Sequence, residues 1–161
     1  LHLVVELDGA PAANDLAAYQ YRLHYVGHHD PVKPALSVAE NLAFWTGLLA
    51  ANGKPGPACA DALERMGMAH LAAVPARFLS AGQRRRLNLA RLAAARKVLW
   101  LMDEPTVVLD EDATLRLGRL ILAHLHEGGS AVIASHAELG FTLTRRLHLE
   151  CGPGVLRAAA Q

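Results

Sequence analysis

Two carboxylates follow directly on a short apolar run, and this pattern has the clearest chemical meaning in the chain. The run is VLWLM at residues 98–102, and the acids are Asp103 and Glu104. A carboxylate at the end of a buried strand can hold Mg²⁺, directly or through water, and a second one can orient a water molecule for attack on phosphorus. The pair suits magnesium-nucleotide chemistry, although standing alone it would more often be a solvated strand end.

Three other features along the chain fit phosphoryl transfer. The sequence LSAGQ at residues 79–83 lies one helix upstream of the acid pair. Asp110 follows Asp103 by seven positions, and His136 comes after a second apolar run at residues 131–134. Their order along the chain makes the acid pair more informative than it is alone.

The LSAGQ turn predicts an anion site at the start of a helix. Ser80 and the backbone amides around Gly82 lie at the predicted N-terminus of that helix. Amide donors and the helix dipole favour a negative group at this position, such as a γ-phosphate. Glycine also permits close approach to the backbone.

The periodicity of apolar residues predicts a single α/β domain. The run at 98–102 has charged neighbours and is typical of a strand buried on both faces of a parallel sheet. Ser37 and Glu40 have the spacing of a helix capping box. The predicted strands cover 3–7, 21–26, 98–102 and 131–134, and the predicted helices cover 37–52, 58–66, 81–96 and 111–127. The Ala-rich tail after Gly154 is expected to fray.

This order of elements predicts where the polar groups meet. In open α/β sheets the ligand lies outside the carboxyl ends of the strands. Asp103, Glu104 and His136 each come at the end of a predicted strand. We therefore expect them at one edge of the sheet, around one crevice.

Taken together, these motifs resemble those of the nucleotide-binding subunits of ABC transporters, over about residues 21–149. LSAGQ stands where that family has its signature motif, VLWLMDEP resembles its Walker B strand, VVLD its D-loop and IASH its switch-histidine segment. The resemblance implies a P-loop NTPase-like ABC ATPase domain over residues 1–161, with a parallel-sheet core. Its helical subdomain would cover about 38–96, and the Walker B to switch-histidine region 97–150.

The resemblance also implies ATP and Mg²⁺ as cofactors and assigns roles at the chain's own site. Asp103 would bind Mg²⁺, and Glu104 would polarise the attacking water. His136 would donate to the γ-phosphate and hold the closed geometry.

Other residues would act on the nucleotide of a second subunit. In the family, the signature turn closes over the nucleotide held by the opposite ATPase subunit of a head-to-tail dimer. The resemblance thus implies that Ser80, Gly82 and Gln83 bind nucleotide in trans, and that Asp110 works across the interface.

A finer resemblance is carried by YVGHHDPVKPALSVAENLAFW, RFLSAGQRRRLNLARL and VLWLMDEP. These segments are similar to the ATP-binding subunits of bacterial haem exporters for cytochrome c maturation. The similarity puts His28 at the Q-loop position, where it would sense metal and nucleotide and contact integral membrane subunits. It implies a peripheral location on the cytoplasmic side of the inner membrane, with no direct haem site in this chain.

A complete P-loop, GxxxxGK followed by Ser or Thr, is missing from the sequence. Gly53-Lys54 is a decoy, because Gly47 precedes Gly53 by six positions and Pro55 replaces the hydroxyl residue. In the family the P-loop precedes the motifs seen here, so a strand, loop and helix of roughly 40 residues would be missing. The chain is either a fragment or a natural truncation, and we expect it to be inactive alone.

Composition argues against several other classes of function. With 16 basic and 15 acidic residues the net charge is +1, so no global field favours nucleic acid or an anionic membrane. Cys59 and Cys151 lack the spacing of a zinc or redox motif. The apolar runs are far shorter than the roughly 20 residues that cross a bilayer.

Two clusters have alternative interpretations. His28, His29 and Asp30, with His24 nearby, could bind a metal, but they lack a second ligand group at a recognisable spacing. The run Arg84-Arg85-Arg86 could be a nucleic-acid patch. Successive helical residues point in different directions, so a solvated or interfacial face is the better interpretation.

Three functions remain open from the sequence alone. The first is an ATPase subunit that drives haem export or a haem-linked step. The second is an inactive subunit that lends its signature turn to a complete partner. The third is an ABC ATPase with another substrate or in a soluble system such as DNA repair or translation, where long insertions or a second ATPase domain are usual.

Overall fold

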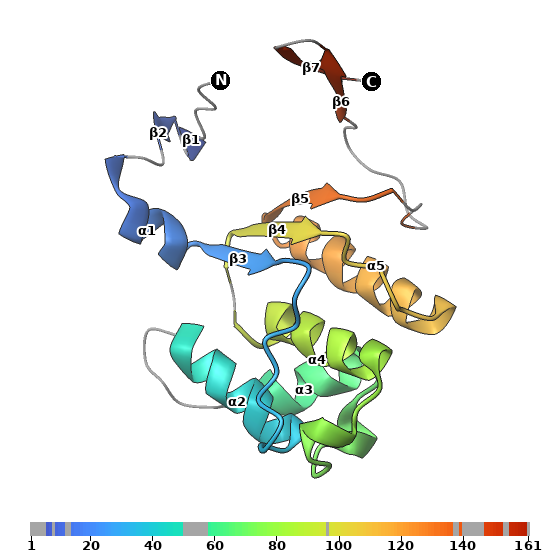
Figure 1. Cartoon of the computed structure of the whole chain (residues 1–161). Coiled ribbons are helices and arrows are strands. Elements are labelled where there is room, and N and C mark those ends of the chain that lie inside the picture. Colours follow the sequence, from blue (N-terminus) through green and yellow to red (C-terminus); the bar gives the residue numbers. More distant parts are fainter. Residues whose placement is uncertain are drawn as a thin grey trace.

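A three-stranded parallel sheet forms the centre of this computed structural model (Figure 1). The structure describes residues 6–7, 9–11, 14–49, 58–95, 97–136, 139, 147–152 and 155–160. The strands are β3 (Leu23–Val26), β4 (Leu99–Asp103) and β5 (Ser130–Ala134), in the spatial order β3-β4-β5. Because helices connect these parallel strands, the predicted α/β fold is confirmed.

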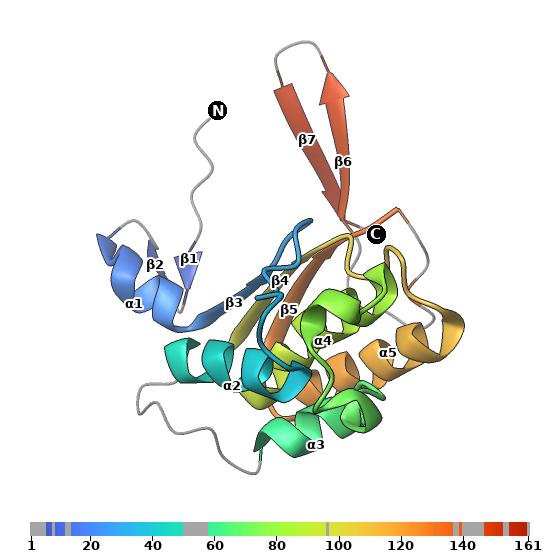
Figure 2. The same ribbon diagram turned by 60° about the horizontal axis from the view of Figure 1, so that its bottom comes forward.

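Helices cover one face of this sheet (Figures 1 and 2). α4 (Ala81–Ala94) and α5 (Glu111–His126) lie next to the strands, and α2 (Val38–Leu49) and α3 (Ala58–Arg65) pack on α4. The four predicted helices are confirmed, while the predicted stop at Asn52-Gly53 and the decoy at Gly53-Lys54 lie outside the described residues. No helix in the described part of the chain is long and apolar enough to cross a membrane.

Local signals explain where these helices begin and end. The Ser37 amide donates to the Glu40 carboxylate at 2.8 Å, and the Glu40 amide donates to the Ser37 hydroxyl at 3.2 Å, which is the predicted capping box. Gly67 follows α3 and Gly128 follows α5 with φ angles of 66° and 86°. Glycine adopts this left-handed conformation without steric cost, so both helices stop there.

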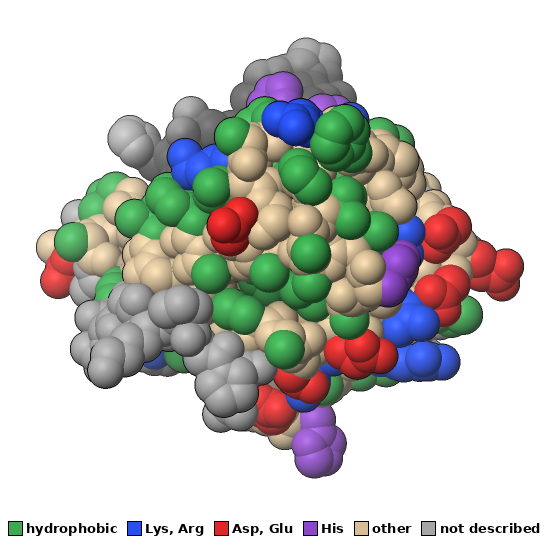
Figure 3. All heavy atoms as spheres, turned by 90° about the horizontal axis from the view of Figure 1, so that it is seen from below, with side chains coloured by type: hydrophobic (Ala, Val, Ile, Leu, Met, Phe, Trp, Pro, Cys, Tyr) green, Lys and Arg blue, Asp and Glu red, His purple; other side chains and the backbone are tan. Residues whose placement is uncertain are grey.

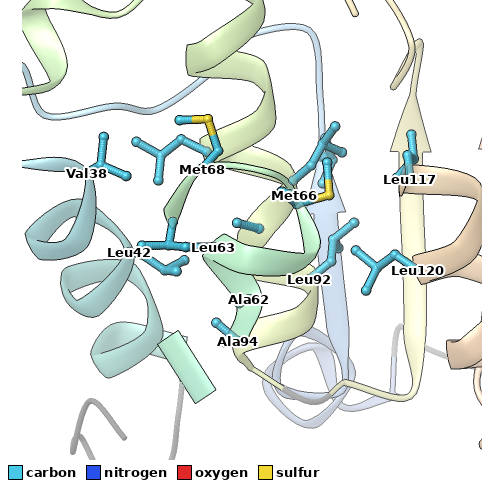
Figure 4. Packing of buried hydrophobic residues seen from close by; sticks show 14 of the residues in the cluster. Val38, Leu42, Ala62, Leu63, Met66, Met68, Leu92, Ala94, Leu117 and Leu120 are labelled. Atoms are coloured by element: carbon cyan, nitrogen blue, oxygen red, sulfur yellow. The ribbon is translucent and has the colours of Figure 1, made fainter. Parts of the chain in front are cut away.

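The hydrophobic core lies within the helical layer and between it and the sheet (Figure 4). Helices α2 to α5 and the turn after α3 supply Val38, Leu42, Ala62, Leu63, Met66, Met68, Leu92, Ala94, Leu117 and Leu120. Trp100 and Met102 of β4 belong to the same cluster. Seen from the helical side (Figure 3), acidic and basic side chains are interspersed around a mostly uncharged surface.

The other face of the sheet carries a row of apolar side chains. Tyr25, Leu101 and Val132 are neighbours in register across the three strands. Tyr25 is 60% exposed and Val132 59% exposed, while Leu101 is half-buried. The prediction of a strand buried on both faces is therefore wrong for Leu101 in the described structure, because the described helices pack on the opposite face.

Both ends of the chain differ from the sequence-based prediction. Of the strand predicted at residues 3–7, the structure describes Glu6 and Leu7. These residues are β1 (Glu6–Leu7), which forms an antiparallel pair with the unpredicted β2 (Ala10–Pro11), because Gly9 at φ 77° allows a tight reversal between them. A helix, α1 (Leu16–Tyr21), replaces the predicted loop and takes Tyr21 out of the strand.

The C-terminal tail was expected to fray after Gly154, and this is wrong. β6 (Leu147–Gly152) and β7 (Val155–Ala160) form an antiparallel hairpin. Both views place it on the side of the sheet away from α4 and α5 (Figures 1 and 2). The paired backbone groups of the ladder outweigh the weak strand preference of alanine.

A buried histidine joins the sheet to the end of α4. His24 of β3 is buried, and its Nε2 lies 2.8 Å from the carbonyl oxygen of Ala95. Burial, with a smaller contribution from the nearby charges of Arg91 and Lys97, lowers the pKa of His24 from 6.5 to about 4 despite the opposing hydrogen bond to Ala95. His24 is therefore neutral at physiological pH and donates to the Ala95 carbonyl as part of the core.

This depressed pKa predicts a loss of stability in mild acid. Between pH 6.5 and about pH 4 the unfolded chain binds a proton on His24 that the folded chain excludes. The free energy of unfolding should fall by roughly 3 kcal/mol across that window. His24→Gln keeps a donor for Ala95 and cannot titrate, so urea unfolding against pH should show a shallower slope for this variant. Equal slopes would contradict the assignment.

Candidate active site

Glu104 and His136 meet at the carboxyl ends of β4 and β5. The Glu104 amide donates to the carbonyl oxygen of Ala134 at 2.8 Å, which joins the end of one strand to the next. Glu104 Oε1 accepts a hydrogen bond from the His136 amide at 3.0 Å and lies 3.6 Å from His136 Nε2. The Ser135 hydroxyl lies 3.4 Å from Oε2. The expected convergence at one sheet edge is present.

Glu104 has an unusual backbone conformation. Its φ angle is 45°, and Val108 at the other end of the same turn has φ 60°. Such left-handed conformations cost about 1–3 kcal/mol in residues other than glycine and persist only where the surroundings hold them. The turn therefore presents Glu104 in a geometry that the rest of the structure must maintain.

Asp103 is the last residue of β4 and is half-buried. Among the described residues, no group of three or more His, Cys, Asp or Glu side chains could hold a metal ion. Mg²⁺ in nucleotide sites commonly takes one or two protein carboxylates, with water and phosphate oxygens as its other ligands. A single strand-end carboxylate such as Asp103 is compatible with that coordination.

The signature turn forms the N-cap of α4. The Ser80 hydroxyl accepts from the Gln83 amide at 3.2 Å, and Gln83 Oε1 accepts from the Ser80 amide at 2.8 Å. The amides of Ala81 and Gly82 belong to the first turn, where an α-helix offers no acceptor of its own. Ser80 is exposed, so the turn presents an anion-attracting helix end at the surface.

Gly82 has a second reason to be glycine that the sequence did not reveal. A Cβ atom at Gly82 would lie 2.7 Å from the carbonyl oxygen of Val108. The start of α4 therefore packs directly on the backbone of the turn that begins at Glu104.

Asp110 follows this turn and caps α5. Its side chain accepts from the Ala113 amide at 2.8 Å, and the residue is exposed. The cap is a local structural role, and an additional contact across a dimer interface remains a prediction.

Arg85 corrects the interpretation of the arginine run as a solvated or interfacial face. It is only 3% exposed. Its guanidinium donates to five acceptors at the ends of β3 and β4, which are the carbonyl oxygens of Gly27 (2.7 Å), Asp103 (3.1 Å), Glu104 (2.7 Å) and Pro105 (3.3 Å) and the carboxylate of Asp30 (3.1 Å). A signal existed in the sequence, because Arg85 shares the helical face of Leu89 and Leu92, which are both buried.

The loop after β3 is anchored at Gly27 and Asp30 and exposes the histidines between them. His28 and His29 are both exposed. Asp30 accepts from Asn88 at 2.8 Å as well as from Arg85. His24 is buried in the sheet, so the four residues considered for a metal cluster point to different environments.

A cavity of about 670 Å³ lies elsewhere, between the C-terminal ends of α4 and α5. Its described lining includes Trp100, His124 and Lys97 and none of the predicted site residues. The hydrogen-bonded cluster at the opposite end of β4 carries the candidate chemistry.

Comparison with solved structures identifies the fold. An ATP-binding protein described as an ABC transporter from Pyrococcus furiosus has a TM-score of 0.73 at 25% identity, over 88% of this chain and 68% of the other. The ATP-binding cassette MJ0796, in a dimeric post-hydrolysis structure with ADP and Pi, has a TM-score of 0.70 at 20% identity, over 81% of this chain and 61% of the other. The fold is that of ABC ATPase domains.

Comparison of sequences identifies the family. The family described as ABC transporter matches residues 4–107. Two curated relatives named "Cytochrome c biogenesis ATP-binding export protein CcmA" come from Paramagnetospirillum magneticum strain AMB-1, at 45% identity over 92% of this chain, and Rhodopseudomonas palustris strain BisB18, at 54% identity over 73%. The chain belongs to the ABC transporter family, and it spans 69% and 57% of the lengths of these two relatives.

The contact at Gly82 can be tested by adding one methyl group. Helix preference alone would make Gly82→Ala stabilising by up to about 1 kcal/mol. The clash with the Val108 carbonyl should reverse the sign and lower the free energy of unfolding by about 1–3 kcal/mol. Urea unfolding of the complete gene product measures the difference, and the exposed neighbour Ala81→Ser serves as control. A more stable Gly82→Ala protein would disprove the contact.

Proposed function

We propose that this chain is the catalytic portion of an ABC ATPase that hydrolyses ATP to drive haem export, or a haem-linked step, across the inner membrane in cytochrome c biogenesis. The observation that carries the hydrolytic part is the Glu104 carboxylate, bonded to the His136 amide and next to Asp103 at the carboxyl edge of the sheet. The names of the curated relatives support a role in cytochrome c biogenesis. The proposal that haem is the cargo rests on the resemblance described in the sequence analysis.

Three residues would act on the nucleotide of the chain's own site. Asp103 would hold Mg²⁺, which neutralises phosphate charge when bound. Glu104 Oε1 is held by the His136 amide, and the longer contact of Oε2 leaves that oxygen available to orient water. The His136 side chain is fully exposed and too far from Glu104 for a hydrogen bond, so its ring can turn towards a γ-phosphate.

The signature turn would serve the nucleotide of a second subunit. Ser80 is exposed at the N-terminus of α4, with Gly82 and Gln83 in the same turn, as a head-to-tail dimer requires. The exposed Asp110 would work across that interface. In this proposal α2, α3 and α4 form the helical subdomain within residues 38–96, and residues 97–150 carry the Walker B to switch-histidine region.

The membrane side of the proposal rests on the loop after β3. His28 is exposed between the two anchors of that loop and would sense metal and nucleotide while contacting integral membrane subunits. The protein would then be peripheral, on the cytoplasmic side of the inner membrane. Cargo contacts would belong to the membrane subunits.

Sequence outside these 161 residues would supply the P-loop, since they contain no GxxxxGK[ST]. The exposed row formed by Tyr25 and Val132, with Leu101 between them, is a suitable face for the helix that accompanies a P-loop. β5 pairs only with β4 among the described strands, so its other edge can accept the P-loop strand.

Removing the charge of Glu104 tests its proposed role. In the complete gene product, assembled with the subunits that its turnover requires, Glu104→Gln should keep ATP affinity. Turnover should fall with a barrier increase of about 3 kcal/mol or more, because the water loses its orienting carboxylate. Glu64→Gln changes an exposed acid of α3 in the same way and should leave the rate unaltered. Normal turnover in Glu104→Gln would exclude Glu104 from the mechanism.

The 161-residue chain alone should bind magnesium-ATP very weakly and show no hydrolysis. Without P-loop amides and lysine it lacks several charge-assisted hydrogen bonds of about 1.5–3 kcal/mol each, so affinity should fall by orders of magnitude. Calorimetric titration with a non-hydrolysable ATP analogue measures this directly, with the complete gene product as reference. Micromolar binding by the purified 161-residue monomer would show that it holds a phosphate site of another kind.

A further inference from the structure

Arg85 joins three segments that the proposed mechanism uses separately. It lies on α4, five residues after Ser80 of the signature turn. Its guanidinium bonds the carbonyl oxygens at the end of β4 and also the two anchors of the loop that carries His28. No other side chain in the described structure has so many hydrogen bonds to these segments.

The donor count shows that Arg85 cannot itself contact a nucleotide. A guanidinium has five N–H groups. One on Nε goes to Pro105, two on Nη1 go to Gly27 and Asp30, and two on Nη2 go to Asp103 and Glu104. Every donor is engaged, and the side chain is buried. Any effect of Arg85 on ATP hydrolysis must therefore act through the groups that it holds.

The group best placed to transmit such an effect is Glu104. Arg85 bonds the carbonyl oxygens of Asp103, Glu104 and Pro105, which lie before, at and after the strained φ of 45°. A planar guanidinium holds these carbonyls in one fixed arrangement. Strained backbone persists only when its surroundings over-determine it, and these bonds supply that restraint. They set the direction in which the Glu104 carboxylate leaves the chain.

The same side chain restrains the loop after β3. Asp30 balances the buried charge of Arg85, and Asn88 on the next turn of α4 donates to the same carboxylate oxygen. Gly27 and Asp30 are therefore both tied to α4, on either side of His28. The end of β4 and this loop are therefore both held against the same helix, α4.

We propose that Arg85 is a positioning residue for ATP hydrolysis, which acts by holding Glu104 in the geometry that the reaction requires, while it also ties the Gly27–Asp30 loop to α4. This inference rests on the function proposed above, with Glu104 as the residue that orients water. It assigns Arg85 no contact with substrate.

Arg85→Lys in the complete, assembled gene product tests the inference. Lysine keeps the positive charge but has three donors without the planar fork, so some of the carbonyl bonds must be lost. The kcat should fall about tenfold to a hundredfold, since small misplacements of catalytic groups cost that much, while the KM for ATP stays within about twofold. Arg65→Lys alters an exposed ion pair with Asp61 and should change neither constant.

A double variant separates positioning through Glu104 from general destabilisation. If Arg85 acts through Glu104, adding Arg85→Lys to Glu104→Gln should lower kcat by less than twofold further, because coupled residues are not additive. Multiplied losses, or an unchanged kcat in Arg85→Lys alone, would overturn the inference. A normal rate in Glu104→Gln alone would instead overturn the proposed function.

A double variant that removes both charges of the Arg85–Asp30 ion pair tests the inference if Arg85→Lys does not fold. Asp30→Asn combined with Arg85→Gln leaves no buried charge, and Gln retains an amide donor for one or two carbonyls. This variant should show the same selective loss of kcat at a temperature where circular dichroism shows it to be folded. Wild-type turnover in this folded variant would overturn the assignment of Arg85.

Discussion

The burial of one positive charge beneath the ends of β3 and β4 constrains the arrangement of the whole candidate site. Moving a charged group out of water costs several kcal/mol unless it is paired and hydrogen-bonded. Arg85 meets that requirement with five acceptors, of which only Asp30 is charged. The other four are backbone carbonyls, so two strand ends must come together at one face of α4. All five hydrogen bonds of Arg85 can form only if the sheet and the helical layer adopt a narrow range of relative positions.

The geometry of the candidate site follows from this arrangement. Parallel pairing of β4 with β5 brings Glu104 next to His136, and the turn after Glu104 then runs back to pack on Gly82. The same helix that anchors the strand ends through Arg85 begins at the exposed Ser80. Glu104, proposed to act on the chain's own nucleotide, and Ser80, proposed to act on a partner's nucleotide, therefore belong to one packed unit. A displacement of one would displace the other.

The described helices cover one face of the sheet and leave apolar side chains exposed on the other. Trp100 and Met102 are buried against helices, whereas Tyr25 and Val132 on the other face are largely exposed. The relatives that the chain matches are longer than it is. Exposed apolar rows often mark a binding surface, and in the proposed function a P-loop helix would pack on this one.

The sequence by itself determined helices α2 to α5, the strands β4 and β5 at the edge of the candidate site and the set of motifs, but not α1, because apolar periodicity, capping residues and motif spacing are local properties. It also predicted that Glu104 and His136 would converge, since parallel strands end at a common edge. Only the tertiary structure decided that Arg85 is buried while its neighbours in the arginine run are not, and that Gly82 is required by the Val108 carbonyl. The apolar spacing of α4 places Arg85 on the inner face of the helix, but the acceptors beside Arg85 and the carbonyl oxygen beside Gly82 come from segments distant in sequence, which only long-range packing brings there.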